Sequence, residues 1–217
     1  GWQAVRGWDW DRWSRAIAAY LGYASFADSC MSIVLEALAE AGSTEETLIV
    51  ATSDHGEMLG RHNLYQKGVL YDPASRLAAV FRGPGVHACP REHLMSHTDL
   101  APTVLDFLGL PPLGAASGTS LRPILLDPTA PGPDYQFIEF NGYISGGIHT
   151  RGAVSRKHKY IYHHHDLDQL FDLEEDPDEC VNVVADPAYA GVLQEHRQAL
   201  AAWMRNTGDF LSPDWQG

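Results

Sequence analysis

Cysteine is scarce in this sequence, and its spacing fits no cluster of metal ligands. Cys30, Cys89 and Cys180 are odd in number and lie far apart, without the close pairs that structural zinc sites use. This pattern argues against a disulfide framework and against a zinc cluster. We expect three buried free thiols, since unpaired cysteine is usually buried.

Basic residues and long apolar runs are also few. The chain has 15 lysine and arginine residues against 28 acidic ones, a net charge of −13. This balance disfavours binding to nucleic acid or to an anionic membrane. No apolar stretch reaches the roughly 18 residues of a membrane span, and the opening "GWQAVRGWDWDRW" is not a signal peptide. We expect neither nucleic acid nor a membrane as a partner, so an anionic substrate would need a local cationic pocket or a metal ion.

The chain is long enough to bury a sizeable core. It has 217 residues, 45% of them hydrophobic, which predicts one large domain or one domain with a small appendage. Apolar residues recur every three or four positions over residues 13–41 and predict a helix buried on one face, which Gly42 ends. Asp9 and Asp11 precede this stretch and are interpreted as surface or helix-start residues.

Strands and a second helix are predicted to follow. The runs "TLIVATS" (47–53) and "LAAVFRGPG" (77–85) are typical of strands covered on both faces. "SHTDLAPTVLDFLGL" (96–110) predicts a short helix with Thr98 or Asp99 as its N-cap. This order is typical of an α/β sheet with helices on its faces, in which sites lie at the carboxyl ends of strands.

A connection rich in proline and glycine covers residues 111–133 and suggests a domain boundary. We expect one domain over residues 1–132 and a small subdomain over residues 133–217. "YQFIEF", "GAVSRKHKYIYHHH" and "QLFDL" predict the short strands of the subdomain, and a terminal helix follows them.

Polar residues crowd the loop after the first predicted strand, "SDHGEMLGRHNLYQK". Asp54 and His55 stand at the strand end, and their oxygen and nitrogen atoms suit a divalent cation such as calcium, magnesium or manganese. From spacing alone, a turn-capping Asp54 and an ordinary surface His55 are equally acceptable. Lys67 could contact an anionic oxygen, and the alternative is a solvated lysine.

The order of motifs resembles the sulfatase family within the alkaline phosphatase superfamily. "TLIVATSDHGEMLGRHNLYQKGVLYD" is similar to the family segment that carries a metal-ligand pair and a substrate-contacting lysine. "RLAAVFRGPGV", "SHTDLAPTVLDFLGL", "GTSLRPIL", "RKHKYIYH" and "QLFDLEEDPDECVNV" follow in the family order. The resemblance runs from about residue 20 to residue 204. It implies the C-terminal part of a sulfatase-like sheet flanked by helices, with a small subdomain of short antiparallel strands and a helix.

The resemblance also implies a chemistry, the hydrolysis of a small-molecule sulfate or phosphate ester. In the family a formylglycine made from Cys or Ser in a C/S-x-P-S-R motif attacks sulfur or phosphorus, and a metal neutralises charge. Carried over, Asp54 and His55 are metal ligands, for Ca²⁺ first and for Mn²⁺ or Zn²⁺ as alternatives. Lys67 contacts the ester's anionic group and stabilises charge in the transition state.

Other histidines and an acidic residue have weaker indications. His62 has a pocket interpretation and a favoured loop-folding one, and for His97 the pocket and capping interpretations stand equal. Glu57 is interpreted as a loop-stabilising acceptor. The run 163–165 is three histidines whose side chains alternate along a strand, so we interpret it as a partly exposed edge and not as a metal site.

The family's nucleophile motif is absent from this sequence, as is the acidic doublet of the first metal pair. We therefore expect the C-terminal half of a sulfatase-like enzyme, inactive alone and in need of an N-terminal half; a homo-oligomer is left open. Two alternatives stand beside a sulfatase: a phosphonate monoester or phosphodiester hydrolase of the same superfamily, and a non-catalytic subunit. Residues 141–152 are candidates for determining substrate specificity, with His149 and Arg151 as residues that could bind an anionic group. Cytoplasm and bacterial periplasm fit equally.

Overall fold

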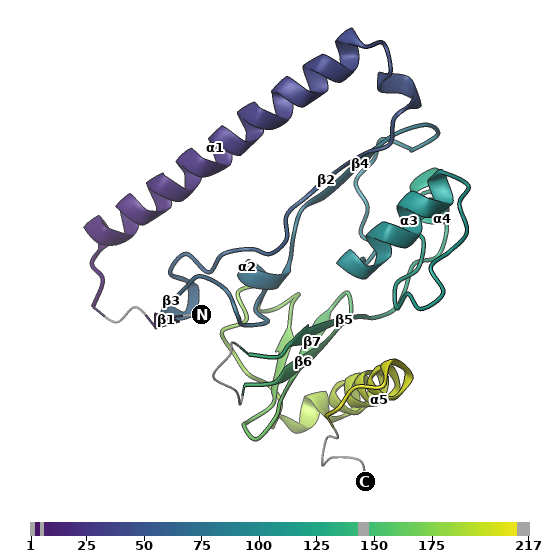
Figure 1. The fold of residues 1–217 in the computed structure, drawn as a ribbon. Helices are drawn as coiled ribbons and strands as arrows, with labels where there is room; N and C mark the ends of the chain where they lie inside the picture. The colour runs from purple at the N-terminus through teal and green to yellow at the C-terminus, as the bar shows by residue number, and fades with distance from the viewer. Residues whose placement is uncertain (1–2, 5–6, 143–147, 212–217) are drawn as a thin grey trace.

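The computed structural model describes residues 3–4, 7–142 and 148–211, and Figure 1 shows its α/β arrangement. A long helix stands beside a two-stranded antiparallel sheet and three short helices. A four-stranded sheet with one covering helix lies below them. The helices are α1 (Trp10–Glu40), α2 (Asp72–Ser75), α3 (Leu100–Phe107), α4 (Arg122–Leu126) and α5 (Ala190–Thr207). The strands are β1 (Gln3–Ala4), β2 (Ile49–Thr52), β3 (Leu64–Tyr65), β4 (Ala79–Arg82), β5 (Gln136–Phe140), β6 (Thr150–Val154), β7 (His158–His163) and β8 (Gln169–Asp172).

Helix α1 begins where the sequence predicts. The side chain of Asp9 accepts a hydrogen bond of 2.9 Å from the backbone N–H of Arg12, which satisfies one of the free donors of the first turn. Asp11 pairs with Arg15 one turn further on. Gly42, with φ of +70°, follows the last turn. The interpretation of Asp9 and Asp11 as helix-start residues is therefore confirmed.

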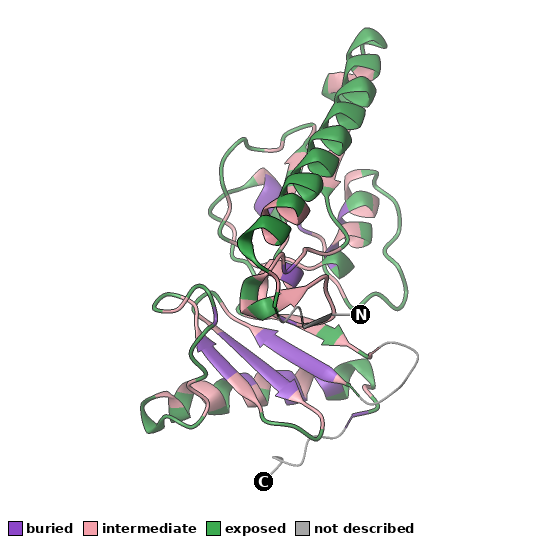
Figure 2. Ribbon diagram, turned by 90° about the vertical axis from the view of Figure 1, so that its left-hand side faces the viewer, coloured by how far each residue is buried: buried purple, intermediate pink, exposed green. Residues whose placement is uncertain are grey.

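The predicted burial of one face of α1 is wrong for the described chain. No residue of α1 is buried, and Figure 2 shows the helix exposed along most of its length. Its exposed apolar side chains include Tyr23 at 78%, Val34 at 68% and Phe26 at 67%. The periodicity is that of a core helix, but no described element packs along its apolar stripe. Exposed apolar residues that follow one another along a helix are typical of a surface that another element or protein covers.

Helix α1 is also long and apolar enough, by length and composition, to cross a membrane. This differs from the expectation that the chain has no such segment. The expectation considered uninterrupted apolar runs, whereas α1 contains a window that is apolar on average although it includes some polar residues. One such helix is weak support for a membrane span, since the core helices of globular proteins pass the same test.

Strands β2 and β4 pair antiparallel, from Ile49 opposite Arg82 to Thr52 opposite Ala79. We predicted strands covered on both faces, yet no residue of either strand is buried, and Val80 is 61% exposed. The burial prediction is wrong because this is a sheet of two strands with no described layer on one side. Uniformly apolar strands of this kind are typical of the centre of a larger sheet.

The four-stranded antiparallel sheet has the order β5-β6-β7-β8 and matches the predicted short strands. Helix α5 packs on one of its faces, and the two share the largest core cluster. That cluster has its centre in Tyr160, Leu170, Leu200 and Met204. Ile161 of β7 and Phe171 of β8 form a second cluster with Leu70, so the other face of the sheet packs against the segment that precedes α2.

All three cysteines are free and exposed, which corrects the expectation that they are buried. Cys30 lies on α1, which has no covering layer, and Cys89 and Cys180 lie in surface loops. A cysteine is buried only where its element is covered, and these three elements are not.

Arg151 is not available to an anionic ligand. Its guanidinium is 1% exposed and forms a two-point ion pair with Asp209, at 2.5 Å from Nε and 3.0 Å from Nη2. The expectation that Arg151 contributes to specificity is therefore wrong, and residues 143–147 of the same segment lie outside the described residues. Burial alone would raise the pKa of Asp209, but hydrogen bonds from Arg151 and from the backbone lower it overall.

We predict that Asp209→Asn lowers the free energy of unfolding by about 3 kcal/mol or more, because it leaves the Arg151 cation buried without its partner. A lowered folded-state pKa means that the contribution of Asp209 is present above its unfolded pKa of about 3.9 and is lost as the pH falls through the folded value. Denaturant unfolding between pH 7 and pH 2.5 measures both effects. Asp11→Asn, at an exposed pair, is the control and should change stability by less than about 1 kcal/mol. Equal effects of the two substitutions would contradict the prediction.

Candidate functional site

The segment from Ser53 to Tyr71 leaves the end of β2 and holds an unusual backbone. Four non-glycine residues in it have positive φ: Leu59 (42°), His62 (52°), Asn63 (55°) and Gln66 (70°). Such conformations cost about 1–3 kcal/mol each and persist only where surrounding contacts hold them. Backbone strain of this kind concentrates at functional sites, and contacts with other segments hold it in place.

Gly56 is held by the backbone of α2. Its N–H donates to the carbonyl of Ala74 at 2.9 Å, and the N–H of Glu57 donates to the carbonyl of Pro73 at 2.8 Å. A Cβ at residue 56 would lie 2.1 Å from the Pro73 oxygen, so no other residue fits this approach. The two bonds place Asp54 and His55 directly before a fixed point of the backbone.

Asp54 and His55 lie side by side at this point. The Oδ2 atom of Asp54 is 3.3 Å from Nε2 of His55, and Oδ1 accepts the backbone N–H of His55 at 2.9 Å. The other ring nitrogen, Nδ1, is 2.9 Å from the carbonyl oxygen of Gly56. Because a carbonyl only accepts, Nδ1 carries a proton. A protonated ring would then pair with Asp54 through Nε2, whereas a neutral ring would have its lone pair on Nε2, free for a cation.

The carboxylate of Asp54 is stabilised in its ionised form. The backbone hydrogen bond from His55 lowers the pKa of Asp54 most, against a smaller rise from desolvation, and the positive charge of Lys67 makes the smallest contribution in the same direction as the hydrogen bond. Lys67 is partly exposed, and among the residues that the structure describes its ammonium has no hydrogen-bond or ion-pair partner. An anion beside Asp54 and His55 could therefore be met by Lys67 without breaking a contact.

These atoms fit part of a cation site. A carboxylate oxygen and an imidazole nitrogen that lie 3.3 Å apart are atoms of the kind that bind a divalent ion. Over the described ranges, no group of three or more His, Cys, Asp or Glu residues is placed to hold a metal. Asp54 and His55 could supply two ligands at most, and a complete coordination sphere would need others.

His62 and Glu57 help to fold the segment. The ring of His62 stacks on Tyr71, with centroids 4.1 Å apart and planes 6° apart, and its Nε2 donates to the carbonyl of Asp178 at 3.0 Å. The carboxylate of Glu57 accepts the N–H of Leu59 at 3.3 Å and the N–H of Gln66. These contacts favour the loop-folding interpretation of His62 over the pocket interpretation.

His97 braces the strand end from the other side. Its Nε2 donates to the carbonyl of Ser53 at 2.8 Å, directly before Asp54. The cap of the following helical turn (His97–Asp99) is Ser96, whose side chain accepts the N–H of Thr98. Asp99 is the N-cap residue of α3, as the sequence predicts, but its side chain makes no capping hydrogen bond to that helix.

Asp99 is buried and serves another purpose. Its carboxylate accepts the N–H of Ser96 at 2.8 Å, the N–H of Thr119 at 2.8 Å and the amide of Gln136 at 3.1 Å. It therefore ties three segments together beside the site. The sequence reading missed this role, although a carboxylate in an otherwise apolar helix start was a visible signal.

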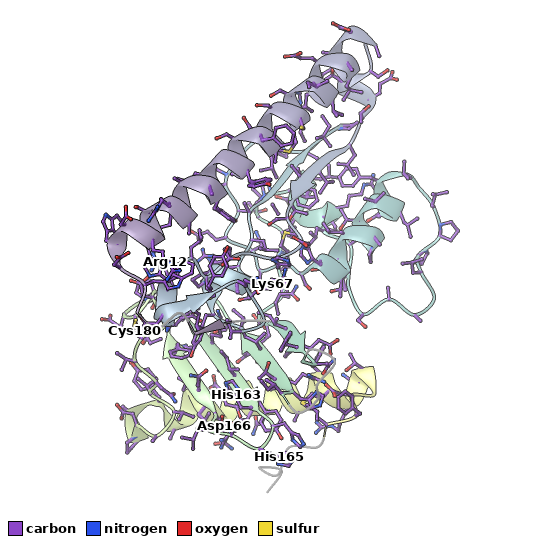
Figure 3. The ribbon with its side chains drawn as sticks, turned by 60° about the vertical axis from the view of Figure 1, so that its left-hand side comes forward. Arg12, Lys67, His163, His165, Asp166 and Cys180 are labelled. Carbon is purple, nitrogen blue, oxygen red and sulfur yellow. The ribbon has the colours of Figure 1, made fainter. Side chains whose placement is uncertain are left out.

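The histidine run is far from these residues. Figure 3 shows Lys67 above the four-stranded sheet and His163 and His165 at its opposite end. His163 is partly buried and lies 3.0 Å from the Gln169 side chain, while His165 is exposed. The run is partly exposed, as predicted, but only His163 lies in a strand, and β7 is not an edge strand. The ring centroids of His164 and His165 lie 3.6 Å apart, so strand alternation does not separate the side chains as predicted.

Two profiles of known protein families match this chain and identify its family. The profile described as "N-sulphoglucosamine sulphohydrolase, C-terminal" matches residues 60–206, and the profile described as "Sulfatase" matches residues 3–110. This chain belongs to the sulfatase family. The two matches together cover the site segment, the helical elements and the four-stranded sheet.

Individual relatives are hydrolases of two kinds. The Delta 4,5-hexuronate-2-O-sulfatase of Bacteroides thetaiotaomicron is 28% identical over 215 residues, 94% of this chain and 44% of that protein. A solved 2-O GAG sulfatase superposes with a TM-score of 0.86 at 27% identity, over 93% of this chain and 45% of that chain. The phosphonate monoester hydrolase of Agrobacterium radiobacter superposes with a TM-score of 0.82 at 28% identity, over 93% and 43% of the two chains.

This sulfatase-family chain spans less than half the length of those relatives. The 93% coverage leaves about 15 of its 217 residues unmatched, fewer than the 31 residues of α1. At least part of α1 therefore belongs to the fold shared with these hydrolases, as expected for a helix with the periodicity of a core helix.

We predict that Gly56→Ala lowers the free energy of unfolding by about 1–3 kcal/mol, because the new methyl group must displace the Pro73 carbonyl. Gly191→Ala is the matched control: position 191 lies on α5 in open space, and alanine should stabilise the helix by about 0.5–1 kcal/mol. Denaturant unfolding of both variants measures the difference. A Gly56→Ala variant as stable as the parent chain would show that α2 does not hold the site segment.

Proposed function

We propose that this chain provides half of the active site of a metal-dependent sulfuric ester hydrolase. The reaction is cleavage of a small-molecule sulfate ester by a formylglycine nucleophile that lies in an N-terminal part of the enzyme. The observation that carries the proposal is the arrangement at the end of β2. Asp54 and His55 lie side by side, with Oδ2 and Nε2 3.3 Å apart, and the positive charge of Lys67, which has no partner among the described residues, acts on the Asp54 carboxylate.

In this proposal Asp54 and His55 hold a divalent cation, and Lys67 binds the anionic group of the ester. Ca²⁺ is the first choice because a carboxylate is a hard ligand, and Mn²⁺ or Zn²⁺ are alternatives that imidazole suits well. When bound, the ion neutralises negative charge on the group being transferred. The ammonium of Lys67 stabilises charge that develops on the sulfate or leaving-group oxygens. His62 and His97 position the loop instead of touching the substrate, since their Nε2 atoms bond to the backbone of Asp178 and Ser53.

The proposed N-terminal half would cover the exposed apolar surface of α1 and β4. Two features support this occupant: the chain spans 44–45% of its sulfatase relatives, and its uncovered helix and strands have core-like sequences. The half would also bring the nucleophile and further metal ligands, whether in the same polypeptide or in another.

A phosphonate monoester or phosphodiester hydrolase is the second candidate. It is favoured by the superposition on the phosphonate monoester hydrolase, which is as close in identity as the sulfatases. The Asp–His pair suits either reaction, because both sulfate and phosphonate esters place an anionic group beside a cation. A non-catalytic sulfatase-like subunit is the third candidate, and turnover measurements separate it from the other two.

We predict that the purified 217-residue chain does not hydrolyse an aryl sulfate, because it carries no C/S-x-P-S-R nucleophile motif. Mixing it with the N-terminal half of a sulfatase relative that carries formylglycine should restore turnover, and Lys67→Ala should lower the restored rate by about 10²-fold or more. Lys157→Ala, at an exposed lysine, is the control. Turnover by the chain alone that Lys67→Ala abolishes would overturn the proposal. Faster turnover of a phosphonate ester than of a sulfate ester would favour the second candidate.

We also predict that Mn²⁺ added to the ¹⁵N-labelled chain broadens the NMR signals of residues 54–56 before those of other segments, because the ion is paramagnetic and the two ligands face one point. Ca²⁺ should reverse the broadening. Asp54→Asn should remove it, while Asp11→Asn at an exposed acidic residue should leave it unchanged. Broadening spread evenly over the acidic surface would contradict a site at Asp54 and His55.

A further inference from the structure

The four-stranded sheet carries a lysine that is buried against the site segment. Lys159, on β7, is 1% exposed, and its ammonium donates to the carbonyl of Leu70 at 3.1 Å. It also pairs with the Glu179 carboxylate at 2.7 Å and with the carboxylate of Asp72. Burying an ammonium is costly unless it is paired and hydrogen-bonded, and here every contact is made to another segment of the chain.

Glu179 completes the same cluster from the turn after β8. Its Oε2 accepts the backbone N–H of Asp72 at 2.5 Å, and its side chain is fully buried. Burial raises the pKa of Glu179, and the charge of Lys159 opposes that rise. The backbone of Glu179 has φ of +55°, a conformation that non-glycine residues rarely adopt. We call Lys159, Glu179 and Asp72 the buried ion cluster.

A second set of contacts joins the same two parts nearer the surface. Arg61 pairs with Asp178, the residue before Glu179, and the His62 ring donates to the carbonyl of Asp178 at 3.0 Å. Tyr71, which stacks on His62, accepts a hydrogen bond of 2.9 Å from the Gln169 amide on β8. The site segment is therefore fastened to β7, β8 and the following turn at its middle and at its end.

A short path leads from the buried ion cluster to the candidate site. Asp72 is the first residue of α2, and the next two residues, Pro73 and Ala74, provide the carbonyls that hold Gly56 and Glu57. Asp54 and His55 lie directly before these held residues. On the other branch, Leu70, whose carbonyl accepts from Lys159, lies three residues after Lys67.

We propose that Lys159 and Glu179 are positioning residues for the site formed by Asp54, His55 and Lys67. The C-terminal sheet then has a task beyond its own stability: its buried cation fixes α2, and α2 fixes the backbone beside the metal ligands. A hydrophobic side chain at residue 159 could fill the same space, but it could not bind Leu70, Asp72 and Glu179 at once. The role in a metal and anion site rests on the proposed function, whereas the coupling between sheet and loop does not.

The experiment compares Lys159→Met with Lys157→Met in the full 217-residue chain. Methionine keeps an unbranched apolar stem and removes the charge, and Lys157 is 63% exposed with one partner, Glu174. Amide hydrogen exchange is measured at Gly56, Glu57 and Asp72, and at Tyr160 and Leu170 within the sheet. Lys159→Met should speed exchange at the first three amides by at least about tenfold more than at the sheet amides, which report the loss of global stability. Lys157→Met should change neither set.

Glu179→Gln provides a second variant that is more certain to fold, because glutamine keeps the size of the side chain and an acceptor for the Asp72 N–H. It should speed exchange at the same three amides and spare the sheet. Mn²⁺ broadening at residues 54–56 should require at least threefold more metal in Glu179→Gln than in the parent chain, which a purely structural role would not cause. Equal acceleration in site and sheet, or no acceleration in the site, would overturn the positioning role.

The two proposals fail in different ways. If Mn²⁺ does not broaden residues 54–56 in the parent chain, the metal site is wrong, and amide exchange alone decides the coupling. If the parent chain binds Mn²⁺ there and Glu179→Gln binds it equally well with unchanged exchange, the metal site stands and the positioning role is wrong.

Discussion

The N–H of Gly56 donates to the carbonyl of Ala74, and the N–H of Glu57 donates to the carbonyl of Pro73. The geometry of the site depends on this contact between two backbone segments. A side chain at residue 56 would collide with the Pro73 oxygen, so the contact requires glycine. It brings the end of β2 against α2, and α2 is itself held by Lys159 and Glu179. The strained residues between the two ends keep their left-handed backbone with the help of these fixed ends and of the contacts of Glu57 and His62.

The same constraint explains why the C-terminal sheet matters to the chemistry. In this chain the sheet packs α5 on one face and Leu70 on the other. A rigid element behind a catalytic loop reduces the conformational freedom that the loop must lose when substrate binds. Asp54, His55 and Lys67 are therefore carried by a loop whose support comes from residues far along the chain.

Local structure was predictable because it follows local rules. The periodicity of residues 13–41 and the cap at Asp9 predict α1, and the apolar runs predict β2 and β4. Burial was not predictable in the same way, because it depends on which other segments are present. The apolar stripe of α1 is a correct signal for a core helix, yet no described segment of this chain covers it.

Some residues of the candidate site were predictable from the sequence, and others were not. Asp54, His55 and Lys67 were identified because they are close together in sequence and match a family pattern. Their geometry adds what spacing could not give, the tautomer of His55 and the charge of Lys67 near Asp54. Lys159 and Glu179 were missed because they lie about 90 to 110 residues after Leu70 and Asp72, and in sequence they look like ordinary surface charges.

The tautomer of His55 tests the central claim most directly. The ¹⁵N chemical shifts of the two ring nitrogens, measured by NMR on the 217-residue chain at alkaline pH, report which nitrogen of the neutral ring carries the proton. If the backbone of Gly56 orients the ring for a cation, Nδ1 is protonated and Nε2 is free beside Asp54. A proton on Nε2 in the neutral ring would place a donor where the metal ligand should be, and it would contradict the site.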